Sequence, residues 1–254
     1  MALTKVGKEG ITGISNSSDA TAITIDSSEN VGVGVSPTTS YGHVVQIHDT
    51  GTGGANLRLT DSTSGSGTGN GLDIIQIGVN THIINRESGS MTLYTSGNDG
   101  IIIDANGHVT NPLQPAFLVS KATGGAQSFN ADTTTTITWS DEHFDNNADF
   151  GSNTFTAPVT GKYQFNVNLR YDEVDSAAAY YQIYLVTSNR TYYSLFASGG
   201  FDQDLSYMNM NMSLLADLDA SDTCYVRVNQ GGGANQSDID GQTVTTNFSG
   251  VLVC

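Results

Sequence analysis

The chain has 254 residues, enough for one large domain or two modest ones, and its net charge is −16, from nine Lys and Arg against twenty-five Asp and Glu. Such a chain lacks the basic surface that phosphate contacts require, which argues against nucleic acid and anionic membranes as partners. It has no apolar run of membrane-spanning length and no secretory signal at its start, so we expect cytoplasmic folding without membrane insertion.

The region up to residue 114 is rich in Gly, Ser, Thr and Asn and is apolar only in short stretches. The strand-like stretches are residues 22–25, 31–33, 44–47, 56–59 and 91–94. Alone, they bury too little apolar surface to offset the entropy lost on ordering. Three copies wound around one axis would supply the missing neighbours and pair the exposed strand edges. We therefore predict an intertwined, trimeric, β-rich stalk over residues 41–114, preceded by an attachment segment over residues 1–40.

A junction follows at residues 111–115, where Pro112 and Pro115 favour an extended connector. Beyond it the apolar residues alternate with polar ones, as in strands with one buried face. This alternation is clearest at residues 162–171, 208–214, 224–229 and 248–252. Turn signals separate about eight such strands. The fold class is therefore all-β, with a jelly-roll head over residues 115–254.

The N-terminal region resembles tail-fibre and tailspike proteins of marine bacteriophages. Residues 20–37 contain the run Asn30-Val31-Gly32-Val33-Gly34 before Pro37, and similar turns precede a β-rich stem in those proteins. Residues 103–109 resemble the segment that often closes such stems. This resemblance implies a virion fibre.

The head resembles the globular domain of complement component one, subcomponent q, and its tumour-necrosis-factor-like relatives. The matching segments, in order, are residues 115–117, 144–145, 155–158, 161–165, 221–226 and 247–252. Ser221 departs from the glycine that relatives usually carry at that turn. The resemblance implies a tight homotrimer used for recognition and for setting the register of the three chains, but it names no ligand.

No catalytic or cofactor motif emerges, so we expect neither an enzyme nor a bound cofactor. The chain has no phosphate-binding Gly-Lys-Ser/Thr, and its five histidines are not grouped with cysteines as in zinc sites. Asp141 and Glu142 are adjacent, so on a strand they point to opposite faces and do not flank one glycosidic bond. Cys224 and Cys254 suggest two ordinary thiols rather than a disulfide framework.

Two groups of residues are candidate sites at the head. Three acidic loops are expected to meet at the distal tip and to bind either a receptor or Ca²⁺, which takes six to eight oxygen ligands. Their carboxylates are Asp172, Glu173, Asp175, Asp202, Asp204, Asp238 and Asp240. The alternative is that these loops are simply solvated. The second group, expected at a trimer interface or stacked against glycan rings, is Tyr180, Tyr181, Tyr184, Tyr192 and Tyr193.

The functional hypothesis is a homotrimeric structural protein of a phage virion, assembled in the host cytoplasm. Its N-terminus would hold other virion proteins, and its distal head would bind a glycan or protein of the host surface. The alternatives are a capsid head fibre or decoration protein without an essential receptor role, a bacterial surface adhesin, and, as an enzyme, a glycan depolymerase.

Overall fold

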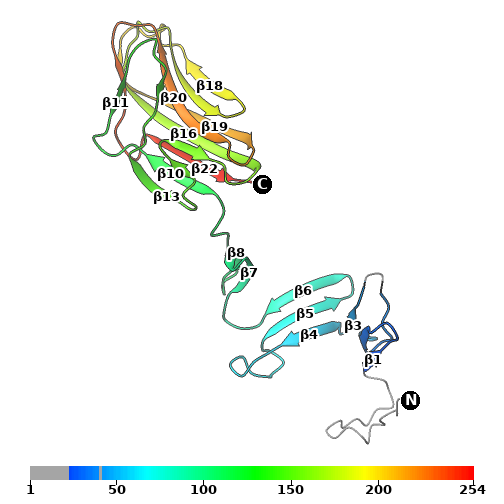
Figure 1. Ribbon diagram of the computed structural model, residues 1–254. Helices are drawn as coiled ribbons and strands as arrows, with labels where there is room; N and C mark the ends of the chain where they lie inside the picture. Colours follow the sequence, from blue (N-terminus) through cyan, green and yellow to red (C-terminus); the bar gives the residue numbers. More distant parts are fainter. Residues whose placement is uncertain (1–22, 40–41) are drawn as a thin grey trace, which may run out of the picture. The chain divides into compact units, whose positions relative to one another are not determined.

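The computed structural model describes residues 23–39 and 42–254, and every regular element among them is a β-strand (Figure 1). No helix in this part of the chain is long and apolar enough to cross a membrane. The predicted attachment segment lies largely outside the described residues, which contain only its positions 23–39.

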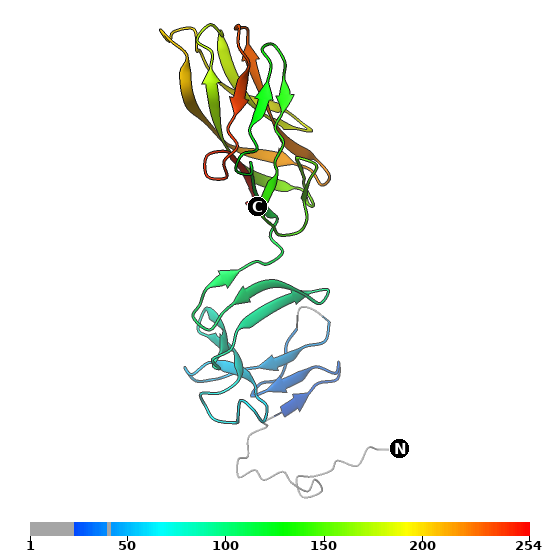
Figure 2. The same ribbon diagram turned by 90° about the vertical axis from the view of Figure 1, so that its left-hand side faces the viewer.

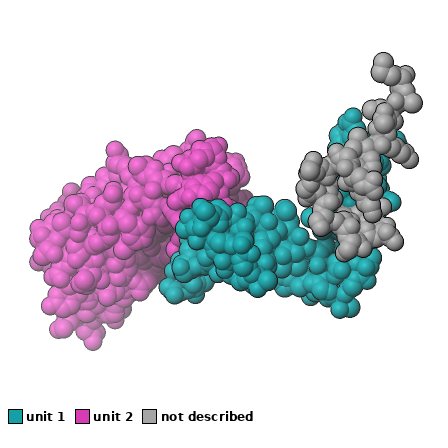
Figure 3. Space-filling model, turned by 90° about the horizontal axis from the view of Figure 1, so that it is seen from below, with its two compact units in different colours: residues 1–91, 103–108 teal, residues 92–102, 109–254 magenta. Residues whose placement is uncertain are grey.

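The chain divides into two compact units, coloured separately in Figure 3. One unit comprises residues 1–91 and 103–108, and the other comprises residues 92–102 and 109–254. The second unit therefore takes in residues upstream of Pro115, where we expected the head to begin. We use the word head below for residues 115–254 alone.

Among residues 23–39 and 42–114, nine strands form three sheets of three strands each, with the orders β1-β2-β3, β4-β5-β6 and β7-β8-β9. Within the first sheet β2 and β3 run parallel, whereas β4, β5 and β6 are antiparallel. Their bounds are β1 Ile23–Ile25, β2 Val31–Val33, β3 Val45–Ile47, β4 Ala55–Leu59, β5 Leu72–Ile77, β6 Asn80–Asn85, β7 Met91–Thr95, β8 Asn98–Ile103 and β9 Val109–Thr110. All five stretches predicted as strand-like contain strands.

The head contains thirteen strands in two facing sheets, the double-sheet arrangement of a jelly roll (Figures 1 and 2). Sheet I has the order β11-β21-β16-β22-β10-β13, with β19 paired to β16, and sheet II has the order β14-β15-β20-β17-β18, with β12 paired to β20. The bounds are β10 Ala116–Ser120, β11 Gln127–Phe129, β12 Thr135–Thr136, β13 Asp141–Asp145, β14 Phe150–Gly151, β15 Thr154–Thr156, β16 Gly161–Val174, β17 Tyr180–Thr187, β18 Thr191–Phe196, β19 Leu205–Leu218, β20 Thr223–Gly231, β21 Ser237–Ile239 and β22 Asn247–Leu252. The jelly-roll prediction is confirmed, with more strands than the eight expected.

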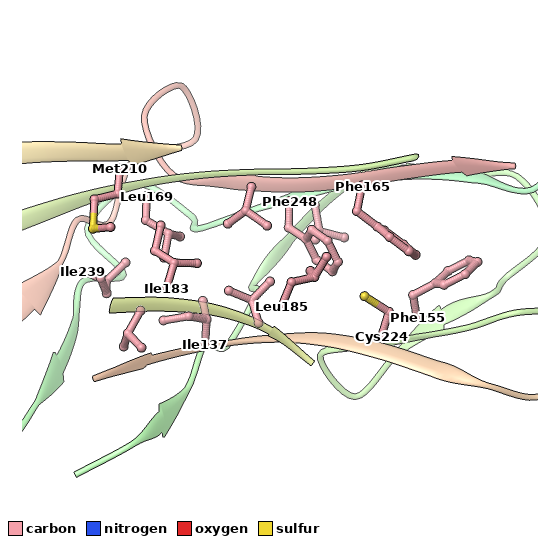
Figure 4. Close-up of a cluster of buried hydrophobic side chains, with 14 of the residues drawn as sticks. Ile137, Phe155, Phe165, Leu169, Ile183, Leu185, Met210, Cys224, Ile239 and Phe248 are labelled. Atoms are coloured by element: carbon pink, nitrogen blue, oxygen red, sulfur yellow. The ribbon is translucent and has the colours of Figure 1, made fainter. Parts of the chain in front are cut away.

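The period-two alternation predicted the buried faces correctly. In β16 every odd-numbered residue from Tyr163 to Tyr171 is buried, and in β20 the buried face includes Cys224, Val226 and Val228. Figure 4 shows Phe165 and Leu169 of β16 pointing toward side chains of the other sheet, among them Cys224 of β20. Full burial of one such side chain contributes about 1.5–3 kcal/mol, so the head holds a core of its own.

Phe117 is central to one end of this core. Its ring centroid lies 4.8 Å from that of Phe150, 5.1 Å from that of Phe155 and 5.0 Å from that of Phe248. The neighbouring strand leaves room for the rings at Gly250, where a Cβ atom would lie 2.5 Å from Phe117. A side chain at Gly250 would therefore displace the aromatic cluster.

Candidate functional site

The three acidic segments come together at one end of the head, and we call them the acidic loops although Asp172 and Glu173 belong to the end of β16 and Asp238 to β21. The backbone N–H and the hydroxyl of Ser176 both donate to Asp204 Oδ1 at 2.8 Å, which ties the first loop to the second. The hydroxyl of Ser237 donates to the carbonyl of Glu173 at 3.0 Å, which ties the third loop to the first. A hollow of about 460 Å³ lies between them.

Asp175 is buried, and its carboxylate holds the acidic loops together through hydrogen bonds to their backbone. Its carboxylate accepts the backbone N–H of Ala234 at 2.7 Å and those of Asn235 and Ala177 at 2.8 Å. These bonds, from Asn235 above all, hold the pKa of Asp175 below its ordinary value although burial acts in the opposite direction. Because its two oxygens already bind the backbone, Asp175 acts as a brace and not as an exposed contact; its prediction as a receptor-contact residue is wrong.

Asp172 and Asp240 share one arginine on the outer face of sheet I. Arg170 donates from Nε to Asp172 Oδ1 at 2.8 Å, and its Nη2 lies 2.8 Å from Asp240 Oδ1. Asp240 is itself buried and also accepts the hydroxyl of Thr245. The Arg170 guanidinium lies 5.0 Å from the ring centroid of Tyr207. The second buried carboxylate of the group, Asp240, is thus neutralised inside the subunit instead of being presented at a free tip.

The remaining acidic candidates are more open, with Glu173, Asp202 and Asp204 exposed and Asp238 half-buried. Within residues 23–39 and 42–254, no three His, Cys, Asp or Glu side chains are grouped as they would be around a metal ion. One subunit therefore shows no preformed set of such ligands for Ca²⁺, and calcium binding stays a prediction for experiment.

The five tyrosines do not form one group, and this part of the prediction is wrong. Tyr181 is fully buried, where its hydroxyl accepts the backbone N–H of Asp175 at 2.8 Å and lies 2.6 Å from the hydroxyl of Ser237. Tyr192 also faces inward and packs against the core. Because neighbouring residues of a strand point to opposite faces, neither side chain shares a surface with the other three. Tyr181 cannot contact a glycan or another subunit.

The other three tyrosines lie on the outer face of sheet II. In register, Tyr184 of β17 is flanked by Tyr193 of β18 on one side and by Arg227 of β20 on the other. The rings of Tyr184 and Tyr193 are 6.2 Å apart between centroids. Tyr180 lies four residues before Tyr184 in β17, on the same face, and pairs with Gly231. We call the surface formed by Tyr180, Tyr184, Tyr193 and Arg227 the tyrosine face.

The alternation of apolar and polar residues in the sequence already indicates which tyrosines lie on the buried face and which on the outer face. Tyr181, Ile183 and Leu185 form the apolar series of their strand, which assigns Tyr180 and Tyr184 to the opposite face. Arg227 likewise alternates with the buried Val226 and Val228. The tyrosines were grouped by closeness in sequence instead of by parity, so Arg227 was missed as their neighbour.

Solved structures resemble this chain in part, at low sequence identity. No family model and no curated protein matches the sequence. Among solved structures, the globular domain of zebrafish complement 1qA protein is 19% identical, with a TM-score of 0.41; the match covers 56% of this chain and 98% of that one. Murine APRIL at pH 8.5 is 10% identical, also with a TM-score of 0.41, over 55% of this chain and 99% of its own. The jelly-roll assignment itself rests on the strand order described above.

Proposed function

We propose that the protein is a homotrimeric virion fibre whose N-terminal strands form a shared stalk and whose head binds the host surface. The observation that carries this proposal is an unfinished apolar face on the sheet β4-β5-β6. Four large apolar side chains on this face are exposed: Leu57 by 45%, Leu59 by 54%, Ile74 by 41% and Ile83 by 58%. They are cross-strand neighbours, because Leu57 and Ile83 both pair with Ile74.

The opposite face of this sheet is satisfied by polar contacts. Asp73 is fully buried there and accepts hydrogen bonds from Arg58 Nε at 2.6 Å, from Asn56 Nδ2 at 3.0 Å and from Arg86 Nε. Two arginines thus compensate one buried carboxylate within a single chain. The carboxylate on this side is compensated, whereas four large apolar side chains on the other side are open to water, which a monomer in water does not favour.

Other copies of this chain are the occupants that fit the open face. Each of the four side chains is already about half buried, so completing its burial would contribute roughly half of the 1.5–3 kcal/mol of full burial, and a symmetric assembly repeats that gain in every copy. Three copies are the number implied by the resemblance of the head to trimeric recognition domains, and three heads would strengthen weak surface contacts by avidity.

The oligomeric state of the full chain tests the stalk. Sedimentation velocity should give a trimer for the wild type and smaller species for Ile74→Asp, because a carboxylate would replace an apolar side chain in the shared core. Ile77→Asp is the matched control: Ile77 is also 41% exposed but lies on the opposite face of the same strand. A monomeric wild type would refute the proposal.

The virion assignment rests on the resemblance of residues 20–37 and 103–109 to phage fibre segments. Gold-labelled antibodies against the head should decorate virus particles, on the tail for an adsorption fibre or on the capsid for a head fibre. Labelling of bacterial cell envelopes in uninfected cultures would instead support the adhesin hypothesis. Binding of purified trimer to host cells, and loss of that binding when free head competes, would locate the receptor contact in the head.

A further inference from the structure

The rings of the tyrosine face are held in fixed positions by the strands beneath them. A Cβ atom at Gly231 would lie 2.4 Å from two carbons of the Tyr180 ring, so this ring lies directly over the glycine backbone. Its opposite side is turned toward solvent, since Tyr180 is 36% exposed. Tyr193 is 60% exposed beside Tyr184. Rings that are already placed lose little conformational entropy when a ligand stacks on them.

Arg227 supplies a positive charge that the head leaves uncompensated. Among the described residues it forms no ion pair and no side-chain hydrogen bond, and its Nε is buried without an acceptor. The other cationic side chains of the head have partners: Lys121 binds Gln127, Lys162 binds Asp217, Arg170 binds two carboxylates and Arg190 lies over Tyr192. A free guanidinium is conspicuous in a head that carries five basic and fifteen acidic residues.

We propose that the tyrosine face binds an acidic glycan, whose sugar rings stack on Tyr180 and Tyr193 while a carboxylate or sulfate group pairs with Arg227. This inference rests on the proposed function and names the ligand class that the head would recognise. Aromatic rings suit the apolar faces of sugar rings, and a guanidinium suits an anionic group through charge-assisted hydrogen bonds. The cross-strand row Arg227, Tyr184, Tyr193 spans two strand spacings, about 10 Å, so the surface suits an extended polymer.

The negative charge of the head favours binding of an acidic glycan at the tyrosine face over its other surfaces. An acidic polymer is repelled by the carboxylates elsewhere on the head, whereas at the tyrosine face Arg227 offers it a guanidinium that no carboxylate of the described residues neutralises. Arg170, on the outer face of the other sheet, is already paired with Asp172 and Asp240. Charge complementarity therefore directs the polymer to the tyrosine face and not to sheet I.

Oligogalacturonate and a sulfated heparin oligosaccharide are suitable probes, with fully methyl-esterified oligogalacturonate as the uncharged match. Saturation-transfer NMR on the full-length protein should show the sugar protons contacting tyrosine rings, and calorimetry should give weak binding to at least one acidic probe. The methyl ester should bind roughly tenfold more weakly than its acid, as expected for the loss of one charge-assisted hydrogen bond. Failure of both acidic probes to bind would overturn the inference.

Single substitutions test the charge contact of Arg227 and the stacking contact of the tyrosines separately. Arg227→Gln should abolish the preference for the acid over the ester, and Tyr193→Ala should weaken both roughly tenfold. Arg190→Gln and Tyr207→Ala are the matched controls, an arginine with an aromatic partner and an equally exposed tyrosine of sheet I, and both should bind like the wild type. Gly231→Ala should weaken binding without removing any ring, because the new methyl group displaces Tyr180. Equal losses for acid and ester in Arg227→Gln would refute the charge contact.

Sedimentation of the same samples distinguishes this inference from the proposed function. A trimer that binds no acidic glycan would refute the inference alone, whereas a monomer would refute the proposed fibre. If Tyr193→Ala dissociated the trimer, the tyrosine face would be an interface between copies, and the glycan inference would fall.

Discussion

The head and the strands before it use the same kind of secondary structure but differ in where their apolar side chains lie. In the head, two facing sheets enclose a continuous core that includes Phe117, Phe165 and Phe248. Among the described residues before the head, Ile75 is the only buried hydrophobic side chain, while Asn30 and Asp73 are buried polar ones. A second sheet, and not strand propensity, is therefore what makes a β-structure self-sufficient. Strands without that second layer need one from another chain.

The largest expected effect lies in the head core. Phe117→Ala should lower the free energy of unfolding of the head by about 3–5 kcal/mol, because it removes a ring that packs against three others. Trp139 is the only tryptophan of the chain and lies 5.9 Å from Phe248 between ring centroids, so its fluorescence in a denaturant titration reports on the head alone.

Phe144→Ala is the control for that substitution, since Phe144 is 46% exposed on the adjacent strand β13. It should change the denaturation midpoint little. Equal losses for Phe117→Ala and Phe144→Ala would mean that the head core is not the self-contained cluster described here.

The next largest effect is a loss of stability at low pH in the strands before the head. Hydrogen bonds from Arg58 hold the pKa of Asp73 well below its ordinary value of 3.8, with further lowering by Arg86 and Asn56. The resulting stabilisation is fully present above 3.8 and is lost as pH falls through the lowered pKa. Hydrogen exchange over residues 55–85 should therefore stay slow at pH 3.8 and accelerate only in stronger acid.

Asp73→Asn sharpens that measurement. The amide keeps the shape of the side chain but removes the ionised partner of the two arginines, so protection should be lower at neutral pH and should depend less on pH. Unchanged protection at neutral pH in Asp73→Asn would show that the buried ion pairs do not hold this sheet together.

A smaller effect is expected at the acidic loops. Tyr181→Phe removes the hydroxyl that accepts the Asp175 N–H, leaving a buried donor without a partner, and should destabilise the head by about 1–3 kcal/mol. Tyr193→Phe is the control, because that ring is exposed on the tyrosine face. Thermal melts that move equally for both variants would contradict the bracing role of Tyr181.

The smallest effect on the fold is expected from thiol labelling. Burial raises the pKa of the Cys224 thiol far above its ordinary value, whereas Cys254 is exposed. A maleimide should therefore modify Cys254 in the native protein and reach Cys224 only after denaturation. Rapid native labelling of Cys224 would show that the head opens readily and would weaken its contrast with the preceding strands.

The sequence predicted the buried faces of the head well because burial on one face of a strand produces period-two alternation, as in residues 163–171. It also predicted the low apolar content that leaves the earlier strands without a core. It failed for the carboxylates, since partners such as Ala234 and Asn235 lie about sixty residues away from Asp175 and only the fold brings them together. The tyrosine grouping is wrong for a different reason: Tyr180 and Tyr181 are neighbours in the sequence, and neighbouring residues of a strand point to opposite faces.

The first and last strands of the head are hydrogen-bonded neighbours, and the Leu252 N–H donates to the carbonyl of Pro115 at 2.9 Å. Cys254 in turn accepts the N–H of Lys162 at the start of β16, while the acidic loops follow the far end of that strand. Fourteen residues of strand separate the two ends by about 45 Å. A fluorescent label on the exposed Cys254 thiol would therefore sit near Pro115, at the opposite end of β16 from the acidic loops, and would leave those loops unobstructed.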